Sequence, residues 1–184
     1  MRELALHILD IAENSIESDA GCVEITVVEN SLDDRLTITI QDNGKGMDAA
    51  AVARVTDPFV THRSTRKVGL GIPLLKFAAE LANGSLSIHS ELGKGTTLTV
   101  DFQRSHIDRM PLGDLASTFM TLVVSNSETH WMFHYQVDGA GFDFDNEPIK
   151  AELGDVSICE PAVLAYIRDS LYTGVSQAQS AIPG

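Results

Sequence analysis

The chain has few cysteines, few basic side chains and no long apolar run. Its two cysteines, Cys22 and Cys159, stand far apart and outside any Cys-x-x-Cys or Cys/His spacing. Neither a zinc site nor a disulfide framework is therefore indicated, and both thiols are expected to be buried and reduced. No apolar run approaches the roughly eighteen residues that cross a bilayer, and acids and an amide interrupt the opening stretch MRELALHILDIAENSI, unlike a signal peptide. We therefore expect a cytoplasmic protein that does not bind a membrane.

Basic residues are scarce. The 184 residues include 13 lysines and arginines and 26 aspartates and glutamates, so the net charge is −13. Such a field repels phosphate backbones, so nucleic acid is not an expected partner. Residues 1–104 hold 10 basic and 15 acidic side chains, whereas residues 105–184 hold 3 and 11. This shift and the Pro/Gly signal in MPLGD predict a first domain over 1–104, an α/β extension over 105–174 and a flexible tail over 175–184.

Apolar periodicity predicts the order of elements in the first domain. Residues 3–18 are predicted to form a helix with a broad apolar face. The polar stripe of that helix consists of His7, Asp10, Asn14 and Glu17. Two alternating stretches, CVEITVVEN and RLTITIQD, predict a β-hairpin that ends at Asp42. A short helix (AAAVARV), an irregular basic segment, a helix (IPLLKFAAELA) and a second hairpin follow. This order predicts an α+β fold, an antiparallel sheet with helices on one face.

The residues beyond Met110 continue with both kinds of element. LGDLASTFMTLVVS predicts a helix, HWMFHYQV and FDFD predict strands, and EPIKAEL and EPAVLAYIRDSLYTG predict two further helices. The apolar side chains of HWMFHYQV share one face, as in a half-buried strand, so core packing is their expected use. Two alternatives remain for this region: a separate domain, or extra layers on the first sheet.

Three glycine-containing stretches carry most of the candidate chemistry. DNGKGM directly follows a predicted strand, and alone it is an ordinary turn signal. VGLGI stands directly before a helix, where backbone amides and the helix dipole can hold phosphate. GKGTT adds a tight turn with a hydroxyl group.

Two polar side chains could bind other parts of a ligand. At a strand end, Asp42 can accept a hydrogen bond from the exocyclic amine of a purine. Asn14 can offer its amide oxygen to Mg²⁺, which prefers oxygen ligands.

These stretches occur in the order found in a known family. HILDIAENSIESDA, DNGKGM, VGLGI and GKGTTLTVDF resemble the N, G1, G2 and G3 boxes of the GHKL superfamily of ATP-binding domains, which includes gyrase, heat-shock chaperones, histidine kinases and MutL. DPFVTHR is similar to the phenylalanine box of histidine kinases. The resemblance covers about residues 4–103. It implies ATP and Mg²⁺ as cofactors and a two-layer α/β sandwich of the Bergerat type, with a mixed, mostly antiparallel sheet.

The resemblance implies a role for each matching residue. Asn14 would bind Mg²⁺, and Asp42 would bind the adenine amino group. Thr96 would help to close the adenine pocket, although a plain strand threonine is the alternative. The full set implied in nucleotide binding is Asn14, Asp42, Gly44, Gly46, Met47, Arg63, Lys67, Gly69, Leu70, Gly71 and Thr96.

Within that set, the glycines and the basic residues have separate implied roles. The glycines of DNGKGM, Gly44 and Gly46, would let the backbone approach the base. The amides of the segment 69–71 would face the phosphates. Arg63, Arg66 and Lys67 would form a basic lid, for which a solvated charge run is the alternative.

The match departs from the hydrolysing members at one position. MutL and gyrase carry a glutamate as general base four residues before the metal-binding asparagine, and this chain has Asp10 there, one methylene shorter. Because a general base must reach the proton that it takes, we expect slow or absent hydrolysis. Histidine kinases have a dimerisation helix ahead of the N box, and this chain begins almost at that box. We therefore expect that it is not a complete histidine kinase.

Three functions follow from these observations. The first is a Mg-ATP-binding regulatory domain in which nucleotide orders residues 48–68 and alters a surface that a protein partner reads. The second is an enzyme, either a slow ATPase with Asp10 as its base or a protein serine kinase similar to the anti-sigma-factor kinases. The third keeps the fold and leaves the pocket unused. The sequence names neither the partner nor the oligomeric state.

Overall fold

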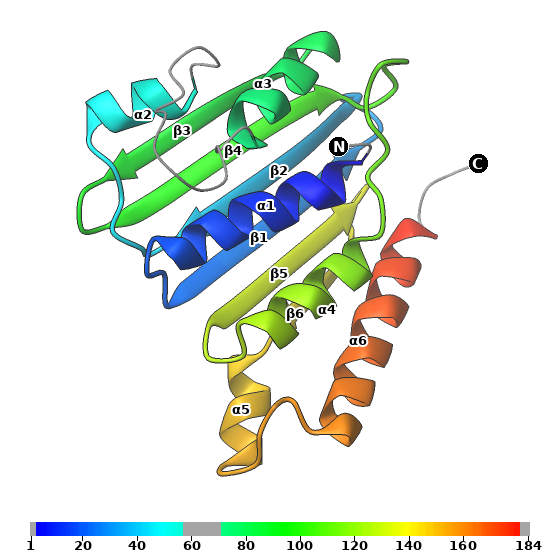
Figure 1. The fold of residues 1–184 in the computed structure, drawn as a ribbon. Helices are drawn as coiled ribbons and strands as arrows, with labels where there is room; N and C mark the ends of the chain where they lie inside the picture. Colours follow the sequence, from blue (N-terminus) through cyan, green and yellow to red (C-terminus); the bar gives the residue numbers. More distant parts are fainter. Residues whose placement is uncertain (1–2, 57–70, 181–184) are drawn as a thin grey trace.

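A six-stranded mixed sheet with helices packed on one face forms the centre of the molecule (Figure 1). The computed structural model describes residues 3–56 and 71–180. The strands follow the order β3-β4-β2-β1-β5-β6 across the sheet. Helices α1, α3, α4 and α6 lie on the same side of it (Figure 1). The α+β class and the mixed, mostly antiparallel sheet predicted from the sequence are confirmed.

The elements agree closely with those predicted from periodicity. The strands are β1 (Cys22–Asn30), β2 (Arg35–Asp42), β3 (Ser85–Glu91), β4 (Gly95–Gln103), β5 (His130–Val137) and β6 (Ala140–Asp145). The helices are α1 (Leu4–Glu17), α2 (Ala49–Val55), α3 (Gly71–Leu81), α4 (Leu115–Ser125), α5 (Glu147–Leu153) and α6 (Pro161–Gln179). Four neighbouring strand pairs are antiparallel, and β1 and β5 are parallel.

Strict alternation along the central strands separates a core face from an outer face. In β1, Val23, Ile25 and Val27 are fully buried, while the residues between them are partly exposed. Because successive side chains of a strand point to opposite faces, one face of the sheet is apolar and packs on the helices. The outer face carries polar side chains such as Thr39 and Thr99, which lie opposite each other in register.

The extension adds strands to the first sheet, which was one of the two alternatives left open. Strand β5 pairs with β1 so that Phe133 lies opposite Ile25, and both side chains are buried. Phe119 of α4 stacks on Phe133, and α4 also packs against α1. Residues of both predicted regions therefore share one core. Their division into separate folding units at residue 104 stays a prediction.

Helix α6 extends beyond the predicted start of the flexible tail at residue 175. It continues to Gln179, and Val175 and Ala178 are buried. Together with Leu171, these residues recur at spacings of four and three, so they continue one buried stripe of the helix. Residues 175–179 are thus held by core packing. Within residues 3–56 and 71–180, no helix is both long enough and apolar enough to cross a bilayer.

Candidate functional site

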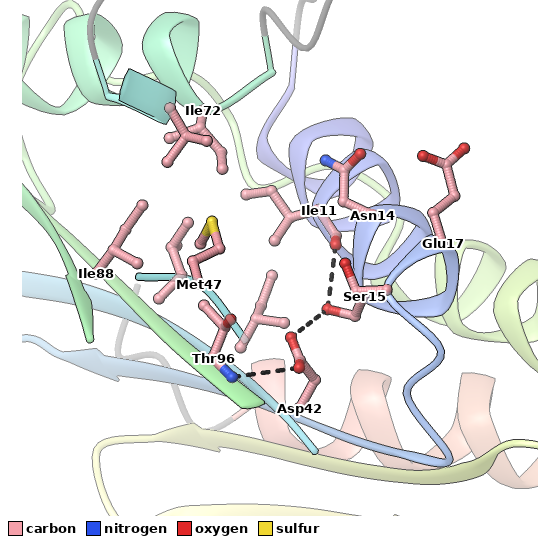
Figure 2. A pocket seen from close by; sticks show the side chains of 13 residues that line it. Ile11, Asn14, Ser15, Glu17, Asp42, Met47, Ile72, Ile88 and Thr96 are labelled. Atoms are coloured by element: carbon pink, nitrogen blue, oxygen red, sulfur yellow. Dashed lines mark hydrogen bonds between the residues drawn. The ribbon is translucent and has the colours of Figure 1, made fainter. Parts of the chain in front are cut away.

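A cavity of about 360 Å³ opens between α1 and the adjoining ends of β2, β3 and β4 (Figure 2). Its apolar lining comes chiefly from Ile11, Ile40, Met47, Ile72, Ile88 and Leu98. Its polar lining includes Asn14, Ser15, Glu17, Asp42 and Thr96. An apolar cavity with a few fixed polar groups is typical of small-molecule sites. Four residues that the sequence assigned to one ligand, namely Asn14, Asp42, Met47 and Thr96, therefore line one cavity.

The Asp42 carboxylate is held by three hydrogen bonds at the end of β2. Its Oδ1 accepts from the backbone N–H of Gly44 at 2.9 Å and of Thr96 at 3.2 Å, and its Oδ2 accepts from Ser15 Oγ at 2.8 Å. The strand register places Asp42 directly opposite Thr96. Because an ionised carboxylate has about four acceptor positions, one remains for a donor in the cavity.

The glycines of DNGKGM are required by close packing of the protein's own backbone. A Cβ on Gly44 would stand 2.7 Å from the carbonyl oxygen of Ser18, at the end of α1. Gly46 has a φ of +68°, and a Cβ there would stand 2.0 Å from the carbonyl oxygen of Glu91. The turn therefore fits tightly between α1 and the β3–β4 hairpin. The predicted role of these glycines, close approach of the backbone to a base, stays a prediction.

A hydroxyl pair supports the side of the cavity formed by β3 and β4. Ser90 Oγ lies 2.8 Å from Thr96 Oγ1 and accepts a hydrogen bond from Met47 N–H at 2.8 Å. Ser90 thus joins the turn after β2 to the hairpin that carries Thr96. Ser90 was not predicted from the sequence, since a serine in an alternating strand carries no distinguishing signal.

Helix α1 brings the second group of polar side chains to the cavity. Asn14 and Glu17 lie on the same face of α1, at the side of the cavity away from Asp42 (Figure 2). Among the residues that the structure describes, no group of three or more His, Cys, Asp or Glu side chains could hold a metal ion.

Asp10 lies against the first residue of α3 and not in the lining of the cavity. A Cβ on Gly71 would stand 1.7 Å from Asp10 Oδ2, so a side chain at this position would displace the carboxylate. The N-terminus of a helix favours a negative charge, because its free N–H groups and its dipole point toward that end. Asp10 therefore occupies a place that suits an anion, next to a residue assigned to phosphate binding.

His7 lies one turn before Asp10 on α1 and is only 2% exposed. Burial lowers the pKa of His7, although Asp10 and the Gly71 backbone oppose this effect. Its Nδ1 is buried and has no hydrogen-bond partner within residues 3–56 and 71–180. No functional role for His7 was predicted from the sequence.

The remaining assignments fall outside the described residues. Arg63, Arg66, Lys67, Gly69 and Leu70 all belong to residues 57–70. The basic lid and most of the predicted phosphate-binding segment therefore stay predictions.

Several residues of the cavity were not singled out in the sequence. Ser15 follows Asn14 directly, and this adjacency was the only available signal for it. The apolar walls include Ile40, Ile88 and Leu98. In the sequence, their alternating spacing indicated only that these side chains face the core. Alternation shows which face a side chain occupies, but it does not show where the core is open.

Comparisons with known proteins agree with this geometry. The family described as "Histidine kinase-, DNA gyrase B-, and HSP90-like ATPase" matches residues 2–106. Sporulation kinase D of Bacillus subtilis is 32% identical over 93 residues, which cover 50% of this chain and 18% of that protein. A putative sensor protein of Shewanella frigidimarina is 31% identical over 110 residues, which cover 59% of this chain and 16% of that protein. The match thus spans less than a fifth of the length of these two relatives.

Two solved structures share the fold over nearly the whole chain. The Aquifex aeolicus MutL ATPase domain complexed with ADP matches with a TM-score of 0.51 and 14% identity, covering 94% of this chain and 70% of that one. The N-terminal domain of a DNA repair protein matches with a TM-score of 0.54 and 14% identity, covering 94% and 57%. At this identity the likeness concerns the fold alone. Because the family match covers more than half of the chain, the protein belongs to the histidine kinase-, DNA gyrase B- and HSP90-like ATPase family and carries its ATP-binding domain.

Proposed function

We propose that this protein binds Mg-ATP in the cavity beneath α1 and acts as a regulatory domain on a protein partner. The observation that carries the proposal is the presence of Asp42 and Asn14 in the lining of one cavity, on different sides of it (Figure 2). The adenine amino group would donate to the free acceptor position of Asp42. The apolar walls would contact the faces of the base, and the phosphates would extend toward Asn14.

The metal site follows from the same arrangement. Asn14 would supply one oxygen ligand to Mg²⁺, and waters and phosphate oxygens would supply the others. The ADP complex of the Aquifex aeolicus MutL domain, which has the same fold, supports a nucleotide as the ligand.

Regulation would act through the segment that follows the Asp42 turn. The first part of the segment 48–68 forms α2, and Val55 of α2 lines the cavity. A nucleotide in the cavity would therefore contact α2, and contacts made in only one arrangement of the segment would shift the population toward that arrangement. We propose that a cytoplasmic protein partner reads this change.

Calorimetry with ATP, in the presence and absence of Mg²⁺, tests the proposal. Asn14→Ala should remove most of the Mg²⁺-dependent part of the affinity and leave the binding of ATP without Mg²⁺ nearly unchanged. The control is Glu13→Ala, because Glu13 is an exposed neighbour on the same helix. The proposal is wrong if the unaltered protein shows no binding at millimolar Mg-ATP, or if both variants behave alike.

A second candidate function is phosphoryl transfer, because Asp10 lies against Gly71 at the start of α3. If phosphate binds at that helix end, the Asp10 carboxylate would lie near it and could act as a general base. ATP labelled at its γ-phosphate separates the outcomes. Label released to water indicates an ATPase, and label on a partner protein indicates a kinase. Asp10→Asn should abolish release while it preserves binding.

A further inference from the structure

A thiol, an imidazole and a carboxylate form a chain of contacts on the sheet face opposite the helices. Cys22 begins β1, His130 begins β5 and Asp145 ends β6. Cys22 Sγ lies 3.7 Å from His130 Nδ1, and His130 Nε2 lies 2.9 Å from Asp145 Oδ1. Cys22 is partly exposed and Cys159 is exposed, so the expectation that both thiols are buried was wrong. Cys22 and His130 directly precede the buried Val23 and Trp131, so they point away from the core.

The fold brings these residues together through the parallel pairing of β1 with β5. That register places Cys22 directly opposite His130, although they are 108 residues apart in the sequence. The β5–β6 hairpin then brings Asp145 beside His130. A backbone hydrogen bond from His130 N–H to the Gly21 carbonyl oxygen, at 2.9 Å, holds the two strand ends together. The arrangement is thus built on the sheet itself.

The carboxylate determines which imidazole nitrogen can accept a proton. Asp145 Oδ1 also accepts a hydrogen bond from Glu147 N–H at 2.8 Å, so the position of the carboxylate is fixed. An ionised carboxylate only accepts hydrogen bonds, so Nε2 of His130 carries the hydrogen in the neutral ring. The lone pair of Nδ1 then faces the Cys22 thiol. Carboxylates commonly fix histidine tautomers in this way.

We propose that Cys22 is a nucleophilic thiol that undergoes exchange with positively charged, low-molecular-weight disulfides. His130 Nδ1 takes the proton from Sγ, and the resulting thiolate attacks one sulfur of the disulfide. The original S–S bond breaks, and the departing thiolate receives the proton from His130. The products are a mixed disulfide on Cys22 and one free thiol, so the reaction needs no further oxidant.

The charges around the thiol explain both the need for His130 and the choice of substrate. Burial raises the pKa of Cys22, and the carboxylates of Glu24, Asp145 and Glu147 raise it further. The thiol therefore keeps its proton at neutral pH unless a base removes it. The same carboxylates attract cationic disulfides and repel anionic ones.

The 184-residue chain with Cys159→Ser has Cys22 as its single thiol and provides the test. The protein is mixed with cystamine, and the mixed disulfide is followed by mass spectrometry at pH 7 and pH 10. General acid–base catalysis contributes about 10²–10⁴-fold, so His130→Asn should slow the reaction at pH 7 at least tenfold. At higher pH hydroxide increasingly removes the thiol proton in place of His130, so the two rates should differ less at pH 10 than at pH 7.

A second pair of variants compares the loss of one carboxylate at two places on β6. Asp145→Asn should slow the reaction at pH 7, because it releases the His130 tautomer. Asp143→Asn removes the same charge from β6, but Asp143 bonds to His134 at 2.6 Å and should leave the rate unchanged. Cystamine should also react faster than the anionic 3,3′-dithiodipropionate.

Equal rates at pH 7 with and without His130 would overturn the proposal, because Cys22 would then be an ordinary half-buried thiol. Equal rates with the cationic and anionic disulfides would overturn the substrate class. Urea unfolding of each variant shows that the compared proteins are folded. If His130→Asn does not fold, Asp145→Asn and Asp143→Asn still test the proposal.

Discussion

Ser15 Oγ donates a hydrogen bond of 2.8 Å to Asp42 Oδ2 and thereby joins α1 to the end of β2. With the two backbone donors on Oδ1, from Gly44 and Thr96, the carboxylate is fixed before any ligand arrives. A fixed acceptor loses little freedom on binding, and preorganisation of this kind strengthens affinity. The cavity thus presents one oriented acceptor in apolar surroundings.

Replacing this acceptor should weaken ATP binding strongly. In Asp42→Asn the amide oxygen can still accept from the two backbone N–H groups, and the amide nitrogen then replaces Oδ2. The Ser15 hydroxyl can turn and accept from this nitrogen, but the adenine amino group would meet a donor in place of the acceptor that it needs. A hydrogen bond to a charged group contributes roughly 1.5–3 kcal/mol, so we expect calorimetry to show about a tenfold to hundredfold loss of affinity. Asp169→Asn, an exposed change on α6, should bind as the unaltered protein does. An equal loss in both variants would contradict the assignment.

The turn after Asp42 should tolerate no side chain at Gly46. Gly46→Ala adds a Cβ at a φ of +68° and 2.0 Å from the Glu91 carbonyl oxygen. Gly93→Ala is the matched control, since Gly93 has a φ of +76° but no atom within 4 Å of a Cβ. The control should lose about 1–2 kcal/mol from the left-handed backbone alone. Urea unfolding should show at least twice that loss for Gly46→Ala, and equal losses would mean that the contact relaxes.

Folding stability should fall in acid because of His7. Burial lowers the pKa of His7, so the unfolded chain binds a proton that the native protein does not. Stability is therefore fully present above the unfolded pKa of about 6.5 and is lost as the pH falls below it, at up to about 1.4 kcal/mol per pH unit. Urea unfolding at pH 7, 6 and 5 should show a smaller fall for His7→Leu than for the unaltered protein. Parallel curves would show that His7 does not titrate in this range.

A buried hydrogen-bonded pair, Tyr135 and Glu29, joins β5 of the extension to the central strand β1. Tyr135 Oη donates to Glu29 Oε1 at 2.8 Å, and Arg104 Nε lies 3.1 Å from Glu29 Oε2. Burial and the adjacent Glu29 both raise the pKa of Tyr135, so its hydroxyl remains a donor. The pair therefore persists at neutral pH.

Removing that hydroxyl should destabilise the protein. Tyr135→Phe leaves Glu29 with one unpaired buried oxygen, and we expect a loss of roughly 1.5–3 kcal/mol in urea unfolding. Tyr166→Phe deletes the same atom from a side chain that is 64% exposed, and it should change stability little. If the two variants unfold alike, the pair contributes nothing to joining the extension to the sheet.

Local spacing predicted the elements with little error, because each pattern depends on neighbours along the chain. The alternation in CVEITVVEN and RLTITIQD became β1 and β2, and the apolar face of the first helix became the buried face of α1. The end of α6 was predicted less well. Its last turns contain mostly small and polar residues, so little in the sequence indicated a helix there. In the folded protein, Val175 and Ala178 are buried in the core, and this packing keeps the last turns helical.

The candidate site was predictable where a motif carried it. Asn14, Asp42 and Thr96 stand in recognisable boxes, and the structure brings them to one cavity. Ser15 and Ser90 act through hydrogen bonds to partners that are distant in the sequence. A serine suits many positions on a helix or strand, so its neighbours along the chain do not reveal such a partner.

The amino-acid order alone was enough to establish the elements, the acidic balance and the family motifs. The parallel pairing of β1 with β5, the contact of Asp10 with Gly71 and the burial of His7 became visible only in the folded molecule. Spacing determines which face of each element is apolar. Which two apolar faces meet, and which polar groups thereby become neighbours, depends on packing the whole core at once.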